Sequence, residues 1–153
     1  MFQNICELPL SKAAAIIDDI RASDLPALRP DYLDRRIATE DWLRQEKQKL
    51  IGETPLNHPI YFFLGDFADG KDRSRPSSII LQLSELPSSI LTFTNGDSMS
   101  CFYNPNRRVM DLGQLRRLAG ATDRLPHNDN PRIKSSFIEI QVWDSSPLEK
   151  HRN

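Results

Sequence analysis

The order of helical and strand-like patterns along the chain constrains its fold more than any single motif. Before Pro55, apolar residues recur at helical spacing, whereas after it they gather in short, nearly continuous segments. Helices that precede strands in this way are typical of an α+β domain with a largely antiparallel or mixed sheet. The sequence contains neither a GxGxxG nor a GxxxxGK[ST] motif, so it does not indicate a βαβ dinucleotide-binding fold or a P-loop enzyme.

The N-terminal part predicts two helices. The first is expected over residues 12–22, with Ser11 as its N-cap. A connector with two prolines, residues 25–30, follows it. The second helix is expected to begin after a cap at Thr39 and to end before Gly52.

The rest of the chain predicts strands and one short helix. The segments expected to form strands are 59–64, 78–83, 90–94 and 136–143. Asn95-Gly96 is a turn signal that closes the third of these segments. Asp111 is a suitable N-cap for a short leucine-rich helix that ends before Gly120, and a long loop is expected over residues 121–132.

Length and charge limit the class of protein. A chain of 153 residues is the common size of one domain, and a single domain over residues 1–153 is expected. The formal net charge of -1 excludes the strong overall basic field of many nucleic-acid-binding proteins. No apolar run is long enough to span a membrane and no signal-peptide pattern is present, so we expect a cytoplasmic protein without a membrane partner. Cys6 and Cys101 belong to no metal-binding motif, and no metal site is expected.

One alternative rests on Ser98. The segment Asn95–Met99 resembles the block that carries the nucleophilic serine of GDSL-type esterases. Those enzymes also need an aspartate three residues before a histidine, and neither His127 nor His151 has one. Because a serine without a base is a poor nucleophile, a serine hydrolase is the weakest of the alternatives.

A carboxylate inside the last expected strand is the strongest single functional signal. Glu139 lies in an otherwise apolar segment, where a charge is costly unless it is paired or functional. Strand alternation places Glu139 on the same face as Phe137, Gln141 and Trp143. The alternative explanation is a strand whose second face meets solvent.

Several short segments, taken in their order, resemble the DarT-type ADP-ribosyltransferases. These segments are Arg35-Arg36, Pro59–Phe62, Ile79–Leu83, Leu91–Thr94, Asp111–Leu115 and Phe137–Val142. Together they extend over most of residues 29–142. The family usually opens with a Tyr-His-x-Thr segment, and the nearest stretch here, Asn4–Leu8, has no histidine.

The resemblance implies an ADP-ribosyltransferase-like fold and an activity that uses NAD as substrate. It implies transfer of ADP-ribose to a nucleic-acid base in single-stranded DNA or RNA. It also implies a toxin of a toxin–antitoxin or phage-defence system, with an antitoxin or chaperone as partner. A protein acceptor remains open, and so does a catalytically inactive, ADP-ribosyltransferase-like binding module.

The resemblance also implies roles for individual residues. Glu139 would stabilise positive charge on the ribose and help to deprotonate the acceptor. Arg35 or Arg36 would pair with the pyrophosphate, and Tyr61 would stack on the nicotinamide. The further NAD contacts are Phe62 and Thr94, and the candidate contacts of the acceptor loop are Arg124, His127 and Arg132.

Two of these residues also have purely structural explanations. Arg35 can form a surface salt bridge with Asp31 or Glu40, and Tyr61 can be an ordinary core residue.

Overall fold

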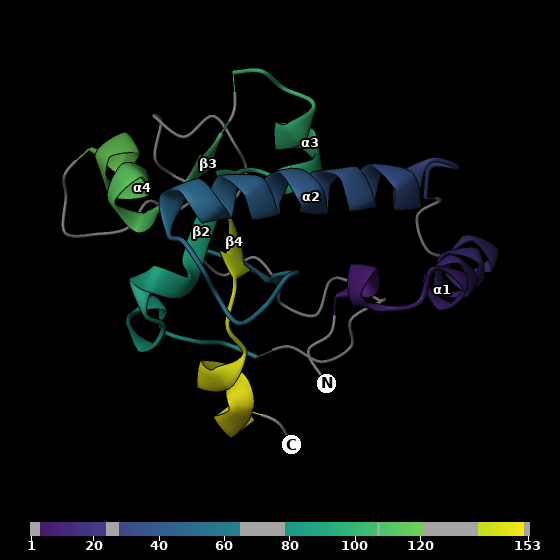
Figure 1. Ribbon diagram of the computed structural model, residues 1–153, viewed down its shortest axis with the longest axis horizontal. Helices are drawn as coiled ribbons and strands as arrows, with labels where there is room; N and C mark the ends of the chain where they lie inside the picture. Colours follow the sequence, from purple (N-terminus) through teal and green to yellow (C-terminus); the bar gives the residue numbers. More distant parts are fainter. Residues whose placement is uncertain (1–3, 24–27, 65–78, 107, 121–137, 152–153) are drawn as a thin grey trace.

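The computed structural model describes residues 4–23, 28–64, 79–106, 108–120 and 138–151. The α-helices are α1 (Leu10–Ala22), α2 (Tyr32–Leu50), α3 (Ser98–Phe102) and α4 (Leu112–Ala119). The strands are β1 (Ile60–Phe63), β2 (Leu91–Asn95), β3 (Val109–Met110) and β4 (Ile138–Val142). Short 3-10 helices cover Ile5–Glu7, Leu83–Glu85, Ser88–Ile90 and Ser146–His151. The predicted α+β class is therefore confirmed, and Figure 1 shows how these elements are arranged.

The four strands form one sheet in the order β1-β4-β2-β3, and every pairing is antiparallel. The carboxylate strand β4 lies between β1 and β2. Glu139 is directly opposite Phe63 on one side and Thr94 on the other. Gln141 is opposite Tyr61 and Thr92 in the same way. Because residues opposite each other in an antiparallel pair share a face, the register collects these side chains on one face of the sheet.

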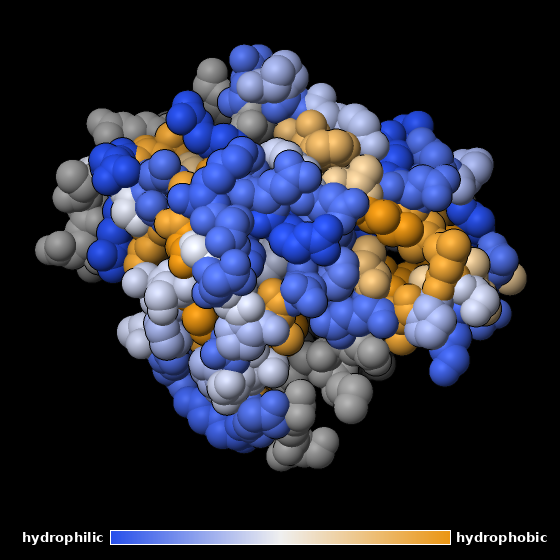
Figure 2. Space-filling view, in the orientation of Figure 1, coloured by the Kyte–Doolittle hydropathy of each residue, from blue (hydrophilic) through white to orange (hydrophobic). Residues whose placement is uncertain are grey.

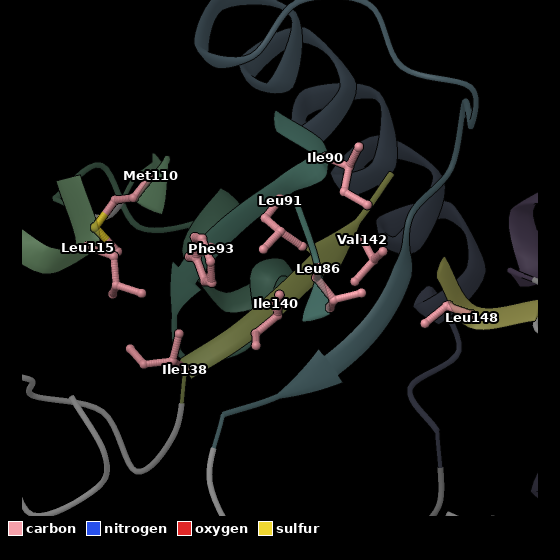
Figure 3. Close-up of a cluster of buried hydrophobic side chains, with 10 residues drawn as sticks. All are labelled: Leu86, Ile90, Leu91, Phe93, Met110, Leu115, Ile138, Ile140, Val142 and Leu148. Atoms are coloured by element: carbon pink, nitrogen blue, oxygen red, sulfur yellow. The ribbon is translucent and has the colours of Figure 1, made fainter. Parts of the chain in front are cut away.

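One face of the sheet is apolar and carries the larger core. Figure 3 shows this cluster, in which side chains of β2 and β4 meet Leu115 of α4 and Leu148 near the C-terminus. Phe62 of β1 is partly buried and packs against the same cluster. The alternate residues of β1, β2 and β4 therefore point to the opposite face.

The opposite face is covered by α2. Leu43 of α2, Val109 of β3 and Trp143 form a second buried cluster between the helix and the sheet. Figure 1 shows α2 lying across the sheet, and Figure 2 shows a largely hydrophilic surface where α2 faces outward. Glu139 is only 4% exposed and accepts from the backbone N–H of Ser98 in α3, so the alternative in which its face meets solvent is wrong.

The predicted starts of both N-terminal helices are wrong. Helix α1 begins at Leu10, after Pro9, which makes no side-chain cap bond. Helix α2 begins at Tyr32, so Arg35 and Arg36 lie inside it rather than ahead of it. Thr39 is not a cap, because its hydroxyl donates to the Arg35 carbonyl one turn earlier, at 2.8 Å.

The other end of α2 follows the sequence pattern. The helix ends at Leu50, with Lys47 and Lys49 in its last turn. Gly52 follows with a φ of 77°, a left-handed conformation that favours glycine.

The predicted strand at 78–83 is also wrong for the residues that are described. Residues 79–82 have no regular structure, and Leu83–Glu85 is a 3-10 helix. The Gln82 backbone N–H donates to Glu85 at 2.9 Å, and this local cap turns the chain. An apolar run becomes a strand only where a neighbouring strand accepts its hydrogen bonds.

The short helix α4 confirms its prediction. Asp111 caps it by accepting from the Gln114 backbone N–H at 2.7 Å, and Gly120 follows with a φ of 88°. The sequence patterns did not predict α3 or β3. Helix α3 is capped by Asp97, which accepts from the Ser100 backbone N–H at 2.9 Å.

Candidate functional site

A row of polar side chains lies buried on the α2 side of the sheet. Gln141 donates to the Thr94 hydroxyl and to Glu139, each at 3.0 Å, and accepts from the Thr92 hydroxyl at 3.0 Å. The Trp143 indole N–H donates to the Thr92 hydroxyl at 2.8 Å. These bonds satisfy the polar groups of strands that a helix covers, so the row can exist in the interior.

Glu139 is the charged member of this row. Its Oε1 accepts from Gln141 and from the Ser98 backbone N–H, the latter at 3.3 Å. Its Oε2 has no hydrogen-bond partner among the described residues. Burial raises the pKa of Glu139, and the bonds from Ser98 and Gln141 and the charge of Arg36 offset only part of that rise.

Helix α2 supplies an arginine and a second carboxylate. Arg36 and Glu40 are four residues apart, a spacing that places both on one face of a helix. Arg36 Nη2 lies 2.9 Å from Glu40 Oε1, and both side chains are buried. The helix thus presents an ion pair to the polar face of the sheet.

Glu40 is bonded from several parts of the chain. Its Oε1 also accepts from Tyr61 Oη at 2.6 Å and from Asn4 Nδ2 at 2.9 Å. His58 Nδ1 lies 3.3 Å from its Oε2. We call Asn4, Arg36, Glu40, His58 and Tyr61 the Glu40 cluster. Burial raises the pKa of Glu40, but the bond with His58, the charge of Arg36 and the bonds from Tyr61 and Asn4 outweigh burial and lower it.

Arg36 is the member of the Glu40 cluster whose charge also acts on Glu139. Its guanidinium lies 4.1 Å from the centre of the Tyr61 ring. Burial lowers the pKa of Arg36, but the Tyr61 phenol and the carboxylates of Glu40 and Glu139 outweigh burial and raise it. Its one hydrogen bond among the described residues uses Nη2. The positive charge of Arg36 is therefore permanent, and none of its other guanidinium N–H groups hydrogen-bonds to a described residue.

Tyr61 is held on both its ring and its hydroxyl. Burial raises the pKa of its phenol, Arg36 opposes that rise, and Glu40 adds to it. The expected core packing of Tyr61 is present, since its ring packs against the cluster of Leu43, Val109 and Trp143, and the Arg36 guanidinium lies over the ring as well.

The structure separates the two arginines that the sequence left as alternatives. Arg35 lies over the Tyr103 ring, 4.1 Å from its centre, and its Nη1 is 3.9 Å from Asp31. Arg36 is the one that joins Glu40 and Tyr61. Of the two structural partners expected for Arg35, Asp31 is confirmed, whereas Glu40 pairs with Arg36.

The predicted NAD contacts fall on different faces. Tyr61 and Thr94 lie on the α2 side, where the Thr94 hydroxyl also donates to the Gly96 carbonyl at 2.9 Å. Phe62 packs in the opposite, apolar cluster, so the thickness of the sheet separates it from Glu139. The expectation that Phe62 shares this site is therefore wrong, because neighbouring strand residues alternate between faces. Arg124, His127 and Arg132, the predicted acceptor contacts, lie outside the described residues.

Sequence reasoning missed the role of Glu40 and its contacts with Asn4 and His58. The i,i+4 spacing of Arg36 and Glu40 was a usable signal, but it was hidden once the helix was expected to begin after Thr39. The contacts of Asn4 and His58 had no local signal, because both join Glu40 across the fold.

Ser98 does not have the surroundings of a nucleophile. It is the first residue of α3 and is fully buried, and its hydroxyl has no hydrogen-bond partner among the described residues. Within the same part of the chain, His58 lies beside Glu40 and not beside Ser98. Within the described ranges, no histidine therefore hydrogen-bonds to Ser98 as a base for the esterase alternative.

The described part of the chain contains no group of three or more His, Cys, Asp or Glu residues placed to hold a metal ion. None of its helices combines the length and hydropathy that crossing a bilayer requires.

No family model, curated protein or solved structure matches this chain.

Proposed function

We propose that this protein is an NAD-dependent ADP-ribosyltransferase whose site is built from Arg36, Tyr61 and Glu139. The observation that carries the proposal is the convergence of these three residues, from α2, β1 and β4, beside one face of the sheet. A negatively charged, ribose-bearing substrate requires an arginine edge and a carboxylate oxygen, and those of Arg36 and Glu139 Oε2 have no other partner within the described part of the chain.

Each residue has a distinct task in this proposal. The guanidinium N–H groups of Arg36 that Glu40 does not use bind the pyrophosphate, and the bond from Nη2 to Glu40 sets the plane of the guanidinium. Glu139 Oε2 accepts a hydrogen bond from a ribose hydroxyl. Tyr61, which is partly buried and carries the Arg36 guanidinium over its ring, contacts the nicotinamide with the accessible part of that ring.

The chemistry is substitution at one ribose carbon. The bond to nicotinamide breaks with its electron pair on the leaving nitrogen, and an acceptor atom forms the new bond to the same carbon and loses a proton. The transition state has oxocarbenium character, as in glycoside hydrolysis. Ionised Glu139 stabilises that charge and takes up the acceptor proton.

A nucleic-acid base is the acceptor we propose. Tyr103 is 52% exposed, and Arg35 lies over its ring at one end of α2. Exposed aromatic rings beside arginines bind single strands by stacking. By resemblance to the DarT-type enzymes, the proposal extends to a toxin of a toxin–antitoxin or phage-defence system with an antitoxin or chaperone partner.

A second candidate is a catalytically inactive binding module of the same architecture. The observation that favours it is burial, since Arg36 is 8% and Glu139 is 4% exposed. In such a module the polar row and the Glu40 cluster act only to hold α2 on the sheet.

Labelled NAD separates the two candidates. The purified protein is incubated with it alone, and then with single-stranded DNA, RNA or a cell lysate. The enzyme predicts label on one polymer, lost in Glu139→Gln and retained in the exposed control Glu53→Gln. Absence of label, of released nicotinamide and of NAD binding would leave the inactive module.

A further inference from the structure

The Glu40 carboxylate joins three separate parts of the chain. Asn4 comes from the N-terminal segment, Arg36 from α2, and His58 and Tyr61 from the segment that enters β1 and from β1 itself. Asn4 Nδ2 also donates to the Pro59 carbonyl at 2.9 Å. Glu40 is 1% exposed, so water does not compete for these bonds.

Glu40 Oε1 alone accepts three hydrogen bonds, at 2.9, 2.9 and 2.6 Å. Two of the donors, Arg36 and Tyr61, are residues that the proposed site uses. One bond fixes the guanidinium through Nη2, and the other fixes the Tyr61 ring through its hydroxyl. Glu40 Oε1 thus bonds both residues of the Arg36–Tyr61 pair, in which the guanidinium lies 4.1 Å from the ring centre.

A ligand would contact the guanidinium edge of Arg36 that does not face Glu40. The guanidinium N–H groups that Glu40 does not use have no partner among the described residues. Because charge-assisted hydrogen bonds are directional, the orientation that Glu40 imposes decides whether those groups face a bound anion. Without Glu40, the buried guanidinium is free to turn toward other acceptors such as Glu139.

We infer that Glu40 is a positioning residue, which aligns Arg36 and Tyr61 for the pyrophosphate and nicotinamide of NAD. The inference rests on the proposed function, but it assigns a role that the resemblance did not contain. A positioning role predicts that removing Glu40 weakens NAD binding, whereas the charge of Glu40 alone predicts the opposite change. Glu40 is negatively charged, so a role limited to its charge would weaken the binding of an anionic ligand. Its removal would then tighten NAD binding.

The test is the affinity for NAD of Glu40→Gln, measured by titration calorimetry. Glutamine keeps the shape of the side chain and removes its charge. We expect the affinity to fall about tenfold or more, because a neutral amide oxygen holds the Arg36 guanidinium more weakly than the carboxylate does. Tyr61→Phe keeps the ring and removes one bond to Glu40, and we expect a smaller loss.

Leu115→Ala is the control for lost stability. Leu115 is fully buried in the apolar cluster on the far face of the sheet, away from the Glu40 cluster. It should bind NAD as the wild type does. Equal or tighter binding by both Glu40→Gln and Tyr61→Phe would overturn the inference while leaving the proposed function intact. If Glu40→Gln does not fold, Tyr61→Phe alone decides between these outcomes.

Ultraviolet titration of the tyrosines gives a readout that needs no NAD. Glu40 raises the pKa of the Tyr61 phenol, so that pKa should fall in Glu40→Gln, and Tyr61→Phe identifies the signal. An unchanged phenol pKa contradicts the inference whether or not NAD binds. A lowered phenol pKa in a protein that binds no NAD would support the contact and reject NAD as its ligand.

Discussion

At the scale of single residues, two buried carboxylates behave in opposite ways. Glu139 is held by neutral donors, and burial raises its pKa. Glu40 faces Arg36, His58, Tyr61 and Asn4, which together lower its pKa despite burial. The difference comes from the partners of each carboxylate, because both are buried to a similar extent.

Glu139→Gln should leave the free energy of unfolding at pH 7 equal or higher. The raised pKa means that the folded state binds the proton more tightly than the unfolded state, whose value is near 4.5. The wild type is therefore most stable relative to the variant below pH 4.5, and it loses that advantage as the pH rises through the folded-state pKa. Urea unfolding from pH 4 to pH 8 measures the difference. A variant that is much less stable at pH 7 would contradict the assigned direction.

Glu40→Ala should lower the free energy of unfolding by about 3–5 kcal/mol, because it leaves the buried Arg36 charge without its partner. The lowered pKa gives the opposite pH dependence. Ionised Glu40 adds to the free energy of unfolding above its ordinary pKa of 4.5, and this stabilisation is lost as the pH falls through the folded-state pKa. Denaturant unfolding at several pH values measures the loss of unfolding free energy.

Glu46→Ala is the matched control on the same helix. Its pair with Lys49 lies at the surface, so the change should be below about 1 kcal/mol.

At the scale of elements, each helix end depends on few residues. Helix α4 has a complete local start signal, since Asp111 and Gln114 bond each other's backbone N–H groups at 2.7 and 3.0 Å. Helix α2 lacks such a signal and begins at Tyr32 without a side-chain cap bond from Asp31. This difference explains why the start of α4 could be predicted and that of α2 could not.

Removal of the cap of α4 tests this account. Asp111→Ala should cost about 1 kcal/mol of unfolding free energy, because one helix N–H loses its acceptor. Asp111→Asn keeps an oxygen at the same place and should cost much less. Thermal unfolding followed by circular dichroism compares the two variants. Equal losses would show that the charge, rather than the hydrogen bond, is responsible.

At the scale of the whole molecule, α2 turns a sheet with one core into a sheet buried on both faces. The contact is made by Leu43 against Trp143 and Val109, with Lys47 5.4 Å from the Trp143 ring centre. Helix α1 lies farther from the sheet, at the opposite end of the molecule from α4 (Figure 1). The stability of the polar site thus depends on the docking of one helix.

Leu43→Ala should therefore destabilise the protein by about 2–5 kcal/mol, the usual cost of a cavity at a fully buried leucine. Tryptophan fluorescence and circular dichroism should report the same transition, since α2 and the central strand unfold together. Leu10→Ala is the control, because Leu10 is 65% exposed and its loss should change little. Two separate transitions in Leu43→Ala would show that α2 detaches before the sheet unfolds.

Features that depend on neighbours along the chain could be predicted from the sequence. The helices before the sheet, three of its strands, the Asp111 cap and the glycine after α2 follow from contacts within a few residues. The alternation of the last strand also placed Glu139 on one face with Gln141 and Trp143. These features are local, so the residues that cause them are visible side by side in the sequence.

The covering of each sheet face and the meeting of distant side chains could not be predicted, because they depend on how separate parts of the chain pack together. The burial of Glu139 under α2 and the convergence of Asn4, Arg36 and Tyr61 on Glu40 join residues far apart in the chain. Phe62 faces the apolar core because the pairing of β1 with β4 sets which alternate residues turn inward. The physical reason is that strand pairing and helix docking are chosen by the total apolar and polar surface buried, which no short segment contains.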